Sequence, residues 1–591
     1  MRCVFMFLKN IILNFTRCFK ILIKVDAKFL VFIFISSIII GFTPSISITL
    51  TQLLINSVQT VNTSLYKILL ILCIYILFNF IVSIFSSINQ YYTSLFQYKL
   101  DRNINLLILE KAGTLSLNSF EDTESYNKIQ RAQNSNKVYS YCSYLITILQ
   151  LSITLFSYII ILISWKWWSI FLICMISIIS TLLINKVNKF RYHMLRKRTE
   201  EEREKWYYQF LLTNDIAFKE IKTYSLAQYF TNKYKLIYDK FIIQDKKYLK
   251  KLFKTNTVIS LLDEICSGSI FTIIILDMYT KKILIGDAVA YINVTNNIKT
   301  AIRQLLLQFS SIYNDTLYIN QLFEFLDMPS EASHSSEQTQ KLQNKINDIS
   351  IDNLSYKYKT QNNYALNKLS ISFKKGETIA IVGQNGAGKS TLAKILAALY
   401  QDYEGSIKIN GIEMKEIDKN SLRKEISILF QDFTKYELSL KENISVSDIS
   451  HQTDENKLYK TIKNIKFPEH IKITQQLGTW FKNGQKLSGG EWIKIGIGRV
   501  LFKNSSLIIL DEPNAALDAL AEIEIFKNIK NISNDKICLI ITHRISNIPF
   551  YADKVLVLDK GEIVGFDSHE ILIKKCDLYQ KLYEADLKIL H

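Results

Sequence analysis

Helix-breaking residues are scarce in this sequence, which has 5 prolines and 18 glycines among its 591 residues. Because proline and glycine interrupt helices most strongly, long stretches are free to continue as single helices. The 8 cysteines form no CxxC pair, and several lie inside apolar runs. This pattern excludes a metal site or disulfide framework and is typical of buried thiols. We also expect no cleaved secretory signal, since Lys9 interrupts the first apolar stretch and no small-residue cleavage site follows.

Hydrophobic residues make up 48% of the chain and aromatic residues 12%, more than in an average soluble protein. A chain of this length exceeds what one core holds, so at least two domains are expected. The formal charge of +18 is compatible with binding to nucleic acid or to an anionic membrane. Basic residues flank the apolar runs, and one run is followed by Lys186, Lys189, Arg191, Arg196, Lys197 and Arg198. This arrangement is typical of cytoplasmic loops, so we expect a lipid bilayer and no nucleic acid as partner.

Six apolar runs are long enough to cross a bilayer, which takes about 20 residues per helix. They lie at 29–51, 67–87, 140–164, 167–185, 258–278 and 286–306. An even number of spans places both termini on one side, and basic links place that side in the cytoplasm. The N-terminal segment, with Arg17, Lys20 and Lys24, is predicted to be an amphipathic helix along the cytoplasmic membrane face.

Two long links, after the second and fourth runs, keep the apolar periodicity of helices, so the membrane helices are predicted to continue into the cytoplasm. Their turns, near Leu117–Tyr126 and Asn214–Tyr224, are expected to contact the C-terminal domain. Residues 329–346 are polar and lack an apolar stripe, as a linker would. The predicted organisation is an all-α transmembrane domain at 1–328, this linker, and an α/β domain at 347–591.

A glycine-rich loop follows the apolar strand at 378–382 and precedes a helical pattern. Its spacing, Gly-x4-Gly-Lys-Ser, allows backbone N–H groups to converge on phosphate groups. In such a loop the lysine neutralises phosphate oxygens and the serine hydroxyl is a ligand of Mg²⁺. The residues predicted to bind the nucleotide are Gly383, Gln384, Asn385, Gly386, Ala387, Gly388, Lys389, Ser390 and Thr391.

Two adjacent acids follow the apolar strand at 507–510. Asp511 stands at the end of this strand, where its carboxylate is predicted to hold the Mg²⁺ shell together with Ser390. Glu512 comes next, where a carboxylate can polarise an attacking water molecule. We predict that Glu512 is catalytic.

The segment LSGGE lies between the phosphate loop and these two acids and consists of Leu487, Ser488, Gly489, Gly490 and Glu491. This order of motifs resembles that of ABC ATPases over the whole of 347–591. The resemblance implies that the nucleotide is ATP. It also implies that Ser488 and Gly490 would cap ATP bound at the Lys389 loop of a second subunit. Because one chain has one ATPase domain and both halves of the site are intact, a homodimer is expected, and a heterodimer with another intact subunit is the alternative.

The same resemblance assigns roles to further residues by motif. Tyr358 resembles the aromatic residue that stacks on adenine, and Gln431 the glutamine that reaches Mg²⁺ and faces the membrane domain. His543 resembles the histidine that contacts the γ-phosphate. Residues 515–518, AALD, resemble the loop that ends at Asp518, although Ala515 replaces the usual serine. Glu512, His543 and Gln431 are therefore the expected catalytic set.

Six spans, long cytoplasmic helices and a C-terminal ATPase domain on one chain resemble an ABC exporter half-transporter of the bacterial cytoplasmic membrane. In that family, ATP closes two ATPase domains together and the helix bundles open outward, and hydrolysis resets them. The segment LGTWFKNGQKLSGGEWIKIGIGRVLF (477–502) resembles exporters of ribosomally made peptides, in particular lantibiotic exporters of the nisin and subtilin type. Two residues depart from that pattern: Ile493 replaces glutamine and Gly496 replaces alanine.

Lipid and multidrug exporters carry Gly-Glu before the signature, where this chain has Phe481–Lys482. A bacteriocin-like peptide is therefore the predicted cargo, and a lipid or multidrug exporter is the alternative. An importer built on the exporter fold is a further alternative with the same ATPase motifs.

The last predicted span is polar along one helical face. This stripe should avoid lipid and line a cavity or contact neighbouring helices. Asp263 and Glu264 lie at comparable depth in the preceding span. One hypothesis is that either acid attracts a cationic peptide, and the alternative is a structural pair with Arg303 or Lys299. The candidate substrate residues are Asp263, Glu264, Asn293, Asn296, Thr300 and Arg303.

Overall fold

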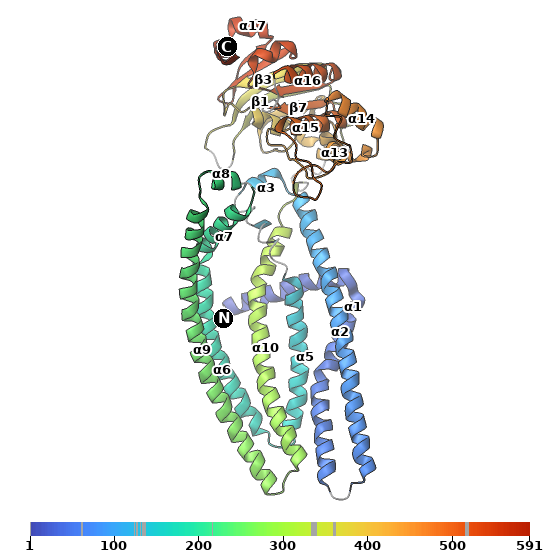
Figure 1. Ribbon diagram of the computed structural model, residues 1–591, viewed down its shortest axis with the longest axis vertical. Coiled ribbons are helices and arrows are strands. Elements are labelled where there is room, and N and C mark those ends of the chain that lie inside the picture. Colours follow the sequence, from blue (N-terminus) through green and yellow to red (C-terminus); the bar gives the residue numbers. More distant parts are fainter. Residues whose placement is uncertain are drawn as a thin grey trace. The chain divides into compact units, whose positions relative to one another are not determined.

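The computed structural model describes residues 2–590 except 61–62, 123–124, 126–127, 130–131, 133–136, 216, 332–339, 359–361 and 514–518. The chain forms two compact units (Figure 1). The helical unit comprises Met1–Ala112 and Asn127–Asp327, and the α/β unit comprises Gly113–Tyr126 and Met328–His591. The turn predicted near Leu117–Tyr126, between the second and third spans, thus belongs to the α/β unit. The predicted linker falls partly on 332–339, outside the described residues.

Long helices joined by short turns make up the helical unit. Since α2 and α9 contain no proline, they continue over 49 and 53 residues. The described helices are α1 (Arg2–Gln59), α2 (Leu65–Gly113), α5 (Val138–Ile163), α6 (Trp168–Lys197), α7 (Thr199–Thr213), α8 (Phe218–Thr223), α9 (Ala227–Tyr279) and α10 (Ile285–Leu326).

A kink at Asp26 divides α1 into an N-terminal helix and the first apolar span. The backbone of Asp26 is non-helical, with φ −165° and ψ 93°. Its side chain accepts a hydrogen bond from the Phe29 backbone N–H at 3.1 Å, as an N-cap residue does at the start of a helix. The Phe29 ring stacks on Phe96 of α2 at 4.2 Å between centroids. The break between the two predicted helices is confirmed, and its cause is a cap.

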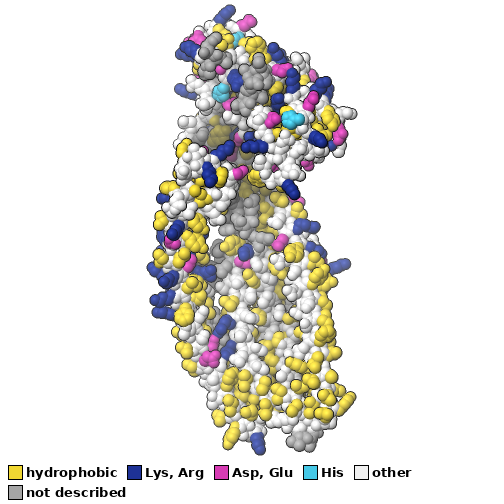
Figure 2. Space-filling view, in the orientation of Figure 1, with side chains coloured by type: hydrophobic (Ala, Val, Ile, Leu, Met, Phe, Trp, Pro, Cys, Tyr) yellow, Lys and Arg dark blue, Asp and Glu magenta, His cyan; other side chains and the backbone are white. Residues whose placement is uncertain are grey.

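Five of the described helices, α1, α2, α5, α6 and α9, are long and apolar enough to cross a membrane. No residue in the most apolar part of α2 is fully buried within this chain. Hydrophobic side chains gather at the end of the helical unit where α1 turns into α2 (Figure 2). The predicted sixth span, 286–306, lies in α10, which is not among the five because polar residues interrupt it. Its crossing of the membrane stays a prediction.

Although it is polar on one face, α10 is built into the helical core. Val294 and Ile298 of α10 are buried with Leu162 of α5 and Ile270 of α9. At the other side of the unit, α6 and α9 lie side by side (Figure 1). One face of α10 is therefore buried in the helical core, and its polar face is exposed.

The α/β unit contains two sheets. Its six-stranded sheet has the order β10-β9-β3-β8-β7-β6, in which β9, β3, β8, β7 and β6 are parallel and β10 is antiparallel. An antiparallel sheet has the order β2-β1-β4-β5. The strands are β1 (Asp348–Tyr356), β2 (Leu366–Lys374), β3 (Thr378–Gly383), β4 (Glu404–Ile409), β5 (Ile412–Glu413), β6 (Ile426–Leu429), β7 (Leu507–Asp511), β8 (Ile537–Ile541), β9 (Lys554–Asp559) and β10 (Glu562–Asp567).

The central strand β3 is buried on both faces, which explains its unbroken apolar sequence. Ala380 and Val382 belong to the core on one side of the sheet, and Ile379 and Ile381 to the core on the other. The α-helices are α3 (Leu117–Glu121), α11 (Lys389–Leu396), α12 (Lys419–Lys424), α13 (Leu440–Ser445), α14 (Glu455–Asn464), α15 (Gly489–Lys503), α16 (Ala519–Ile532), α17 (His569–Lys575) and α18 (Asp577–Leu590). Short 3-10 helices are η2 (Met414–Glu416), η3 (Ile449–His451) and η4 (Ile545–Phe550).

The short helix α3 packs on the α/β unit. The Tyr400 hydroxyl donates to the two carboxylate oxygens of Glu121 at 2.7 and 2.8 Å. Asn118 donates to Asp402 at 3.2 Å, and Leu117 packs against one apolar core. The described residues of the first predicted turn therefore contact the C-terminal domain, as the sequence predicts. The second turn contains α8, and its contact stays a prediction.

Candidate nucleotide site

The phosphate loop leaves the carboxyl end of β3 and enters α11, in the position where α/β sheets bind ligands. Gly383, Gly386 and Gly388 have φ of 154°, 82° and 98°, which favour glycine. A Cβ atom on Gly388 would lie 2.5 Å from the Ala365 carbonyl oxygen. At Gly383 and Gly388 the backbone therefore leaves no room for a side chain, which explains these two glycines of the motif.

Lys389 is buried and folded back onto its own loop. Its Nζ donates to the carbonyl oxygens of Gly383 at 2.9 Å and Gln384 at 3.1 Å. Burial lowers the pKa of Lys389, and the carboxylates of Glu512 and Asp511 oppose this shift. A phosphate group in the loop would supply the anionic acceptor that these carbonyl groups now replace.

A cleft of about 950 Å³ opens over the loop, large enough for a nucleoside triphosphate. It brings together most of the residues that the sequence singles out, including Gln431, Glu512 and His543. Sequence reasoning missed Asn363, Tyr364 and Lys560. Lys560 has φ 46° in the tight turn between β9 and β10, and it could have been found only by locating that hairpin. The described lining residues are Tyr358, Asn363, Tyr364, Ala365, Asn385, Gly386, Ala387, Gly388, Lys389, Ser390, Thr391, Gln431, Glu512, His543 and Lys560.

Asp511 has the properties of a residue that holds a metal ion. Burial raises the pKa of Asp511, while a hydrogen bond from Ser390 opposes the shift. Its Oδ1 is buried and has no hydrogen-bond donor among the described residues. A buried carboxylate oxygen without a donor, next to a serine hydroxyl, fits the oxygen ligands that Mg²⁺ prefers.

Glu512 follows β7 with φ 48°, an uncommon conformation for a residue with a side chain. Gln431 Nε2 donates to Glu512 Oε2 at 2.7 Å, and His543 Nε2 donates to Glu512 Oε1 at 2.7 Å. The three expected catalytic residues therefore form one cluster. In this arrangement each carboxylate oxygen accepts one hydrogen bond and keeps a lone pair, so Glu512 can also accept from an attacking water molecule.

Tyr358 is half-buried at the edge of the cleft. Its hydroxyl lies 3.1 Å from Thr391 Oγ1, and its ring meets Tyr356 and Tyr400 edge-on at 5.2 and 5.8 Å. The aromatic side chain expected to stack on adenine is thus tied both to the phosphate loop and to the tyrosine that contacts α3.

The signature LSGGE begins α15. Ser488 is the N-cap, its side chain accepts from the Glu491 N–H, and the Glu491 carboxylate accepts from the Ser488 N–H at 2.7 Å. Among the described residues that line the cleft, none comes from this signature. Gly489 instead lines a neighbouring cavity with Gln431 and Glu512. The role of Asp518 cannot be placed in this way, because residues 514–518, Ala515 included, lie outside the described residues.

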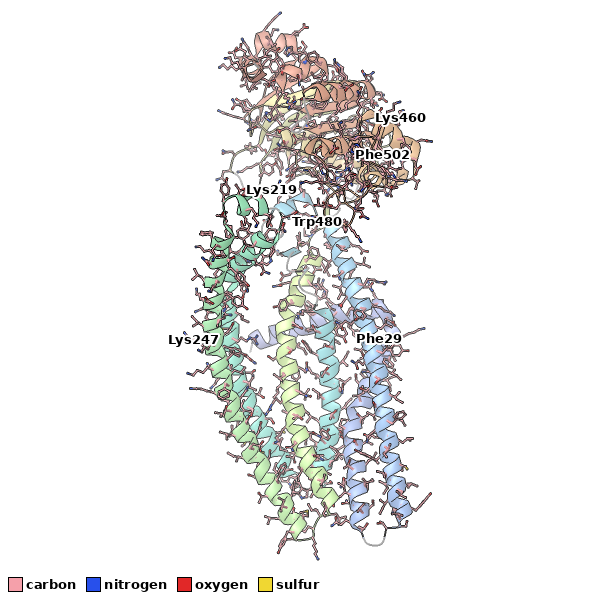
Figure 3. The ribbon with its side chains drawn as sticks, viewed as in Figure 1. Phe29, Lys219, Lys247, Lys460, Trp480 and Phe502 are labelled. Atoms are coloured by element: carbon pink, nitrogen blue, oxygen red, sulfur yellow. The ribbon has the colours of Figure 1, made fainter. Side chains whose placement is uncertain are left out.

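Packing explains one of the two departures in the signature helix. A Cβ atom on Gly496 would lie 2.6 Å from Leu429 Cδ1 of β6, so alanine does not fit there without movement. Ile493 is buried in the same core. Just before the signature, Trp480 and Phe481 are exposed on a loop, and Figure 3 labels Trp480.

The structure separates the candidate substrate residues. Asp263 forms an ion pair with Arg303, which is the structural alternative considered for it. Glu264 is exposed. The remaining polar residues, Asn293, Asn296 and Thr300, are all exposed on α10. These three lie on one exposed face of α10, and that this face avoids lipid stays a prediction.

Comparisons with known proteins identify the family. Residues 366–515 match the family described as ABC transporter. The subtilin transport ATP-binding protein of Bacillus subtilis is 36% identical over 577 residues, which cover 96% of this chain and 94% of that protein. The nisin transport ATP-binding protein of Lactococcus lactis subsp. lactis is 32% identical over 582 residues, which cover 97% and 96%.

A solved structure supports the fold. The structure of a bacterial Atm1-family ABC exporter with ATP bound has a TM-score of 0.78, with 20% sequence identity, and the match covers 94% of this chain and 98% of that one. Both the long helices and the α/β domain are therefore matched. The chain belongs to the ABC transporter family, as a multi-pass exporter that binds and hydrolyses ATP to drive transport.

Proposed function

We propose that this protein exports a ribosomally made, lantibiotic-like peptide across the bacterial cytoplasmic membrane. The observation that carries the proposal is that similarity to the subtilin and nisin transport proteins extends over 96% and 97% of the chain. Cargo passes through the membrane domain, whereas exporters of different cargo share the core ATPase motifs. The likeness includes that domain.

We propose that two copies form the working transporter, with ATP between the Lys389 loop of one copy and Ser488 and Gly490 of the other. The signature lies outside the cleft that its own phosphate loop forms, so it is available to a second copy. Ser488 caps α15, and the N-terminus of that helix carries a partial positive charge that favours phosphate. Closure of the two ATPase domains would complete each site.

Within each site, the residues of this chain act on phosphate and water. Lys389 would exchange its carbonyl acceptors for phosphate oxygens of ATP, and Ser390, Gln431 and Asp511 are the residues that would hold Mg²⁺. Mg²⁺ neutralises charge on the phosphate oxygens. Glu512, positioned by Gln431 and His543, orients and polarises the attacking water.

For the topology, we propose that the ATPase domain and both termini lie in the cytoplasm. Basic residues beyond the apolar part of α6, such as Lys186 and Lys189, are exposed, as are Lys246 and Lys247 before the apolar part of α9. Such residues remain on the cytoplasmic side during insertion. The domain division that we propose is a membrane domain at 1–328, a linker at 329–346 and the ATPase domain at 347–591.

The function is tested by ATPase activity of the full-length protein in lipid nanodiscs, with subtilin and nisin as probes. We expect saturable stimulation by peptide, absent in Glu512→Gln. Uptake of the same peptides into inverted vesicles would give the direction of transport and exclude an importer. Stimulation only by lipids or small amphiphiles would replace the peptide assignment with the lipid or multidrug exporter.

A further inference from the structure

A small cavity lined by both apolar and polar side chains lies within the helical unit, between α6, α9 and α10. Three charged side chains line it: Asp263 of α9 and Lys299 and Arg303 of α10. Its volume of about 30 Å³ is enough for about two water molecules, or for one group of similar size such as a carboxylate. The described polar residues that α6 contributes are Ser177, Ser180, Thr181, Asn185 and Asn188.

The cavity lies near one boundary of the membrane. At a rise of about 1.5 Å per residue, Asp263 is about 25 Å along α9 from the turn that joins α9 to α10. Arg303 is about 28 Å along α10 from the same turn. Since the hydrocarbon core is about 30 Å thick, both side chains lie near its far boundary. On the proposed topology this is the cytoplasmic boundary, where cargo enters.

The charges around the cavity do not balance. Asp263 pairs with Arg303. Lys299 donates to the Ser267 hydroxyl, and among the described residues no carboxylate forms an ion pair with it. The cavity therefore carries one surplus positive charge. Ionisable side chains inside membrane domains are costly and characteristically mark pathways for substrates or ions.

A second observation points to an occupant. Ser180 is 5% exposed, and its Oγ has no hydrogen-bond partner among the described residues. A buried hydroxyl without a partner is unfavourable unless a bound group satisfies it. Lys299 and Ser180 can both donate hydrogen bonds, which suits an anionic acceptor.

We propose that this cavity binds a carboxylate of the exported peptide. The inference rests on the proposed function and reverses the expectation that Asp263 attracts a cationic cargo, because Arg303 already neutralises Asp263. From the cavity, Thr300, Asn296 and Asn293 follow on the exposed face of α10 at helical spacing. They offer hydrogen-bond partners to the rest of an extended peptide.

The experiment compares nisin with nisin whose carboxylates have been converted to amides, using ATPase activity in nanodiscs of zwitterionic lipid. We expect the amidated form to need about tenfold higher concentration for half-maximal stimulation, the loss of one charge-assisted hydrogen bond. Lys299→Gln should remove this difference, since it takes away the surplus charge and leaves the Asp263–Arg303 pair. Lys299→Arg should keep it.

Lys282→Gln is the matched control, because Lys282 is an exposed lysine in the turn between α9 and α10 and should keep the tenfold difference. Equal stimulation of the wild-type protein by both forms of nisin would overturn the inference and leave the proposed function intact. If neither form stimulates, the proposed function fails. Stimulation by phosphatidylglycerol that Lys299→Gln abolishes would then assign the cavity to a lipid headgroup. If Lys299→Gln does not fold, the comparison of nisin with amidated nisin on the wild-type protein and on Lys299→Arg still tests the inference.

Discussion

Glu512 is held by two hydrogen bonds from Gln431 and His543, the two side chains proposed to form the catalytic set with it. Its carboxylate accepts from Gln431 and from His543, each at 2.7 Å. Glu512→Gln keeps the shape of the side chain and removes its charge. We expect ATP hydrolysis to fall by about 10²- to 10⁴-fold, the usual contribution of a general base, while ATP binding is retained.

The matched control is Glu524→Gln, which neutralises an exposed glutamate of α16 in an ion pair with Lys466. Exposed pairs contribute about 0–1 kcal/mol, so its hydrolysis rate should stay near that of the wild type. Phosphate release measures hydrolysis, and a fluorescent ATP analogue measures binding. Equal rates in wild type and Glu512→Gln would remove Glu512 from the catalytic set.

Asp511 is predicted to make Mg²⁺ binding depend on pH. Burial raises its pKa above the ordinary 3.8. The folded protein therefore holds this proton to higher pH than the unfolded chain does, and above 3.8 the carboxyl favours folding progressively less as pH rises. Mg²⁺ competes with the same proton. The Mg²⁺ concentration needed for half-maximal hydrolysis should rise as pH is lowered. Asp511→Asn should abolish this dependence of the Mg²⁺ requirement on pH.

Titrations of Mg²⁺ at several pH values, with ATP in excess, provide the measurement. A Mg²⁺ requirement that stays constant with pH, after correction for Mg²⁺ binding to ATP itself, would mean that the carboxyl is already fully ionised.

At the scale of elements, α3 is connected to the nucleotide cleft through tyrosine side chains. Tyr400 donates to Glu121 of α3, its ring stacks on Tyr356 at 5.1 Å, and it meets Tyr358 edge-on. Burial and the Glu121 carboxylate raise the pKa of Tyr400, so its hydroxyl remains a donor. A movement of Tyr358 on adenine binding would therefore be transmitted through Tyr400 to α3.

Tyr400→Phe removes this hydrogen bond and keeps the ring. We expect basal hydrolysis and ATP affinity to change less than about threefold, and peptide stimulation to fall strongly, because the lost bond joins the ATPase core to α3. A hydrogen bond to a charged group contributes about 1.5–3 kcal/mol. A double-mutant cycle with Glu121→Gln should show coupling in the stimulated rate. Additive effects of the two substitutions would argue against this connection.

Among the elements, those whose sequence repeats a simple pattern could be predicted. The strand before the phosphate loop and the long helices follow from apolar runs and from the lack of proline. The capping box of Ser488 and Glu491 could have been found from its spacing, yet its glutamate was assigned to the nucleotide because the motif resembles a binding signature. The grouping of residues 113–126 with the α/β unit could not be predicted in detail, since it depends on Tyr400, which is distant in sequence.

At the scale of the whole molecule, a composite site predicts complementation between defective chains. Lys389→Ala disables the phosphate loop, and Ser488→Arg disables the signature that would cap the other copy's ATP. Either variant alone should lose hydrolysis. When the two chains are co-expressed, mixed dimers contain one doubly defective site and one intact site, so hydrolysis should exceed that of both variants.

Isolation of the mixed dimer with two different affinity tags, followed by ATPase measurement, makes this test. Lys389→Ala paired with Lys389→Ala is the control for tagging. Mixed dimers as inactive as that control would either contradict the composite site or show that both sites must be intact for either to turn over. Trapping of ATP in the intact site separates these two outcomes, because it requires a formed site but no turnover.

The sequence alone predicted the pairing of a membrane domain with an ATPase domain, because spanning runs and phosphate-binding motifs both have strong local signals. It could not distinguish the partners of Asp263, since an ion pair with Arg303 and a cargo contact require the same residues at the same depth. Nor did it reveal the surplus charge at Lys299, which depends on how three helices meet. Such questions are decided by packing between distant segments.

The contact between Glu121 and Tyr400 joins residues that are 279 positions apart. A ribosome adding about 5–20 residues per second makes Tyr400 about 15–55 s after Glu121. During that interval α3 has been synthesised, but the surface around Tyr400 on which it packs has not. The α/β unit is therefore assembled from two segments made at different times, and α3 has to wait for its docking site until the last third of the chain has been synthesised.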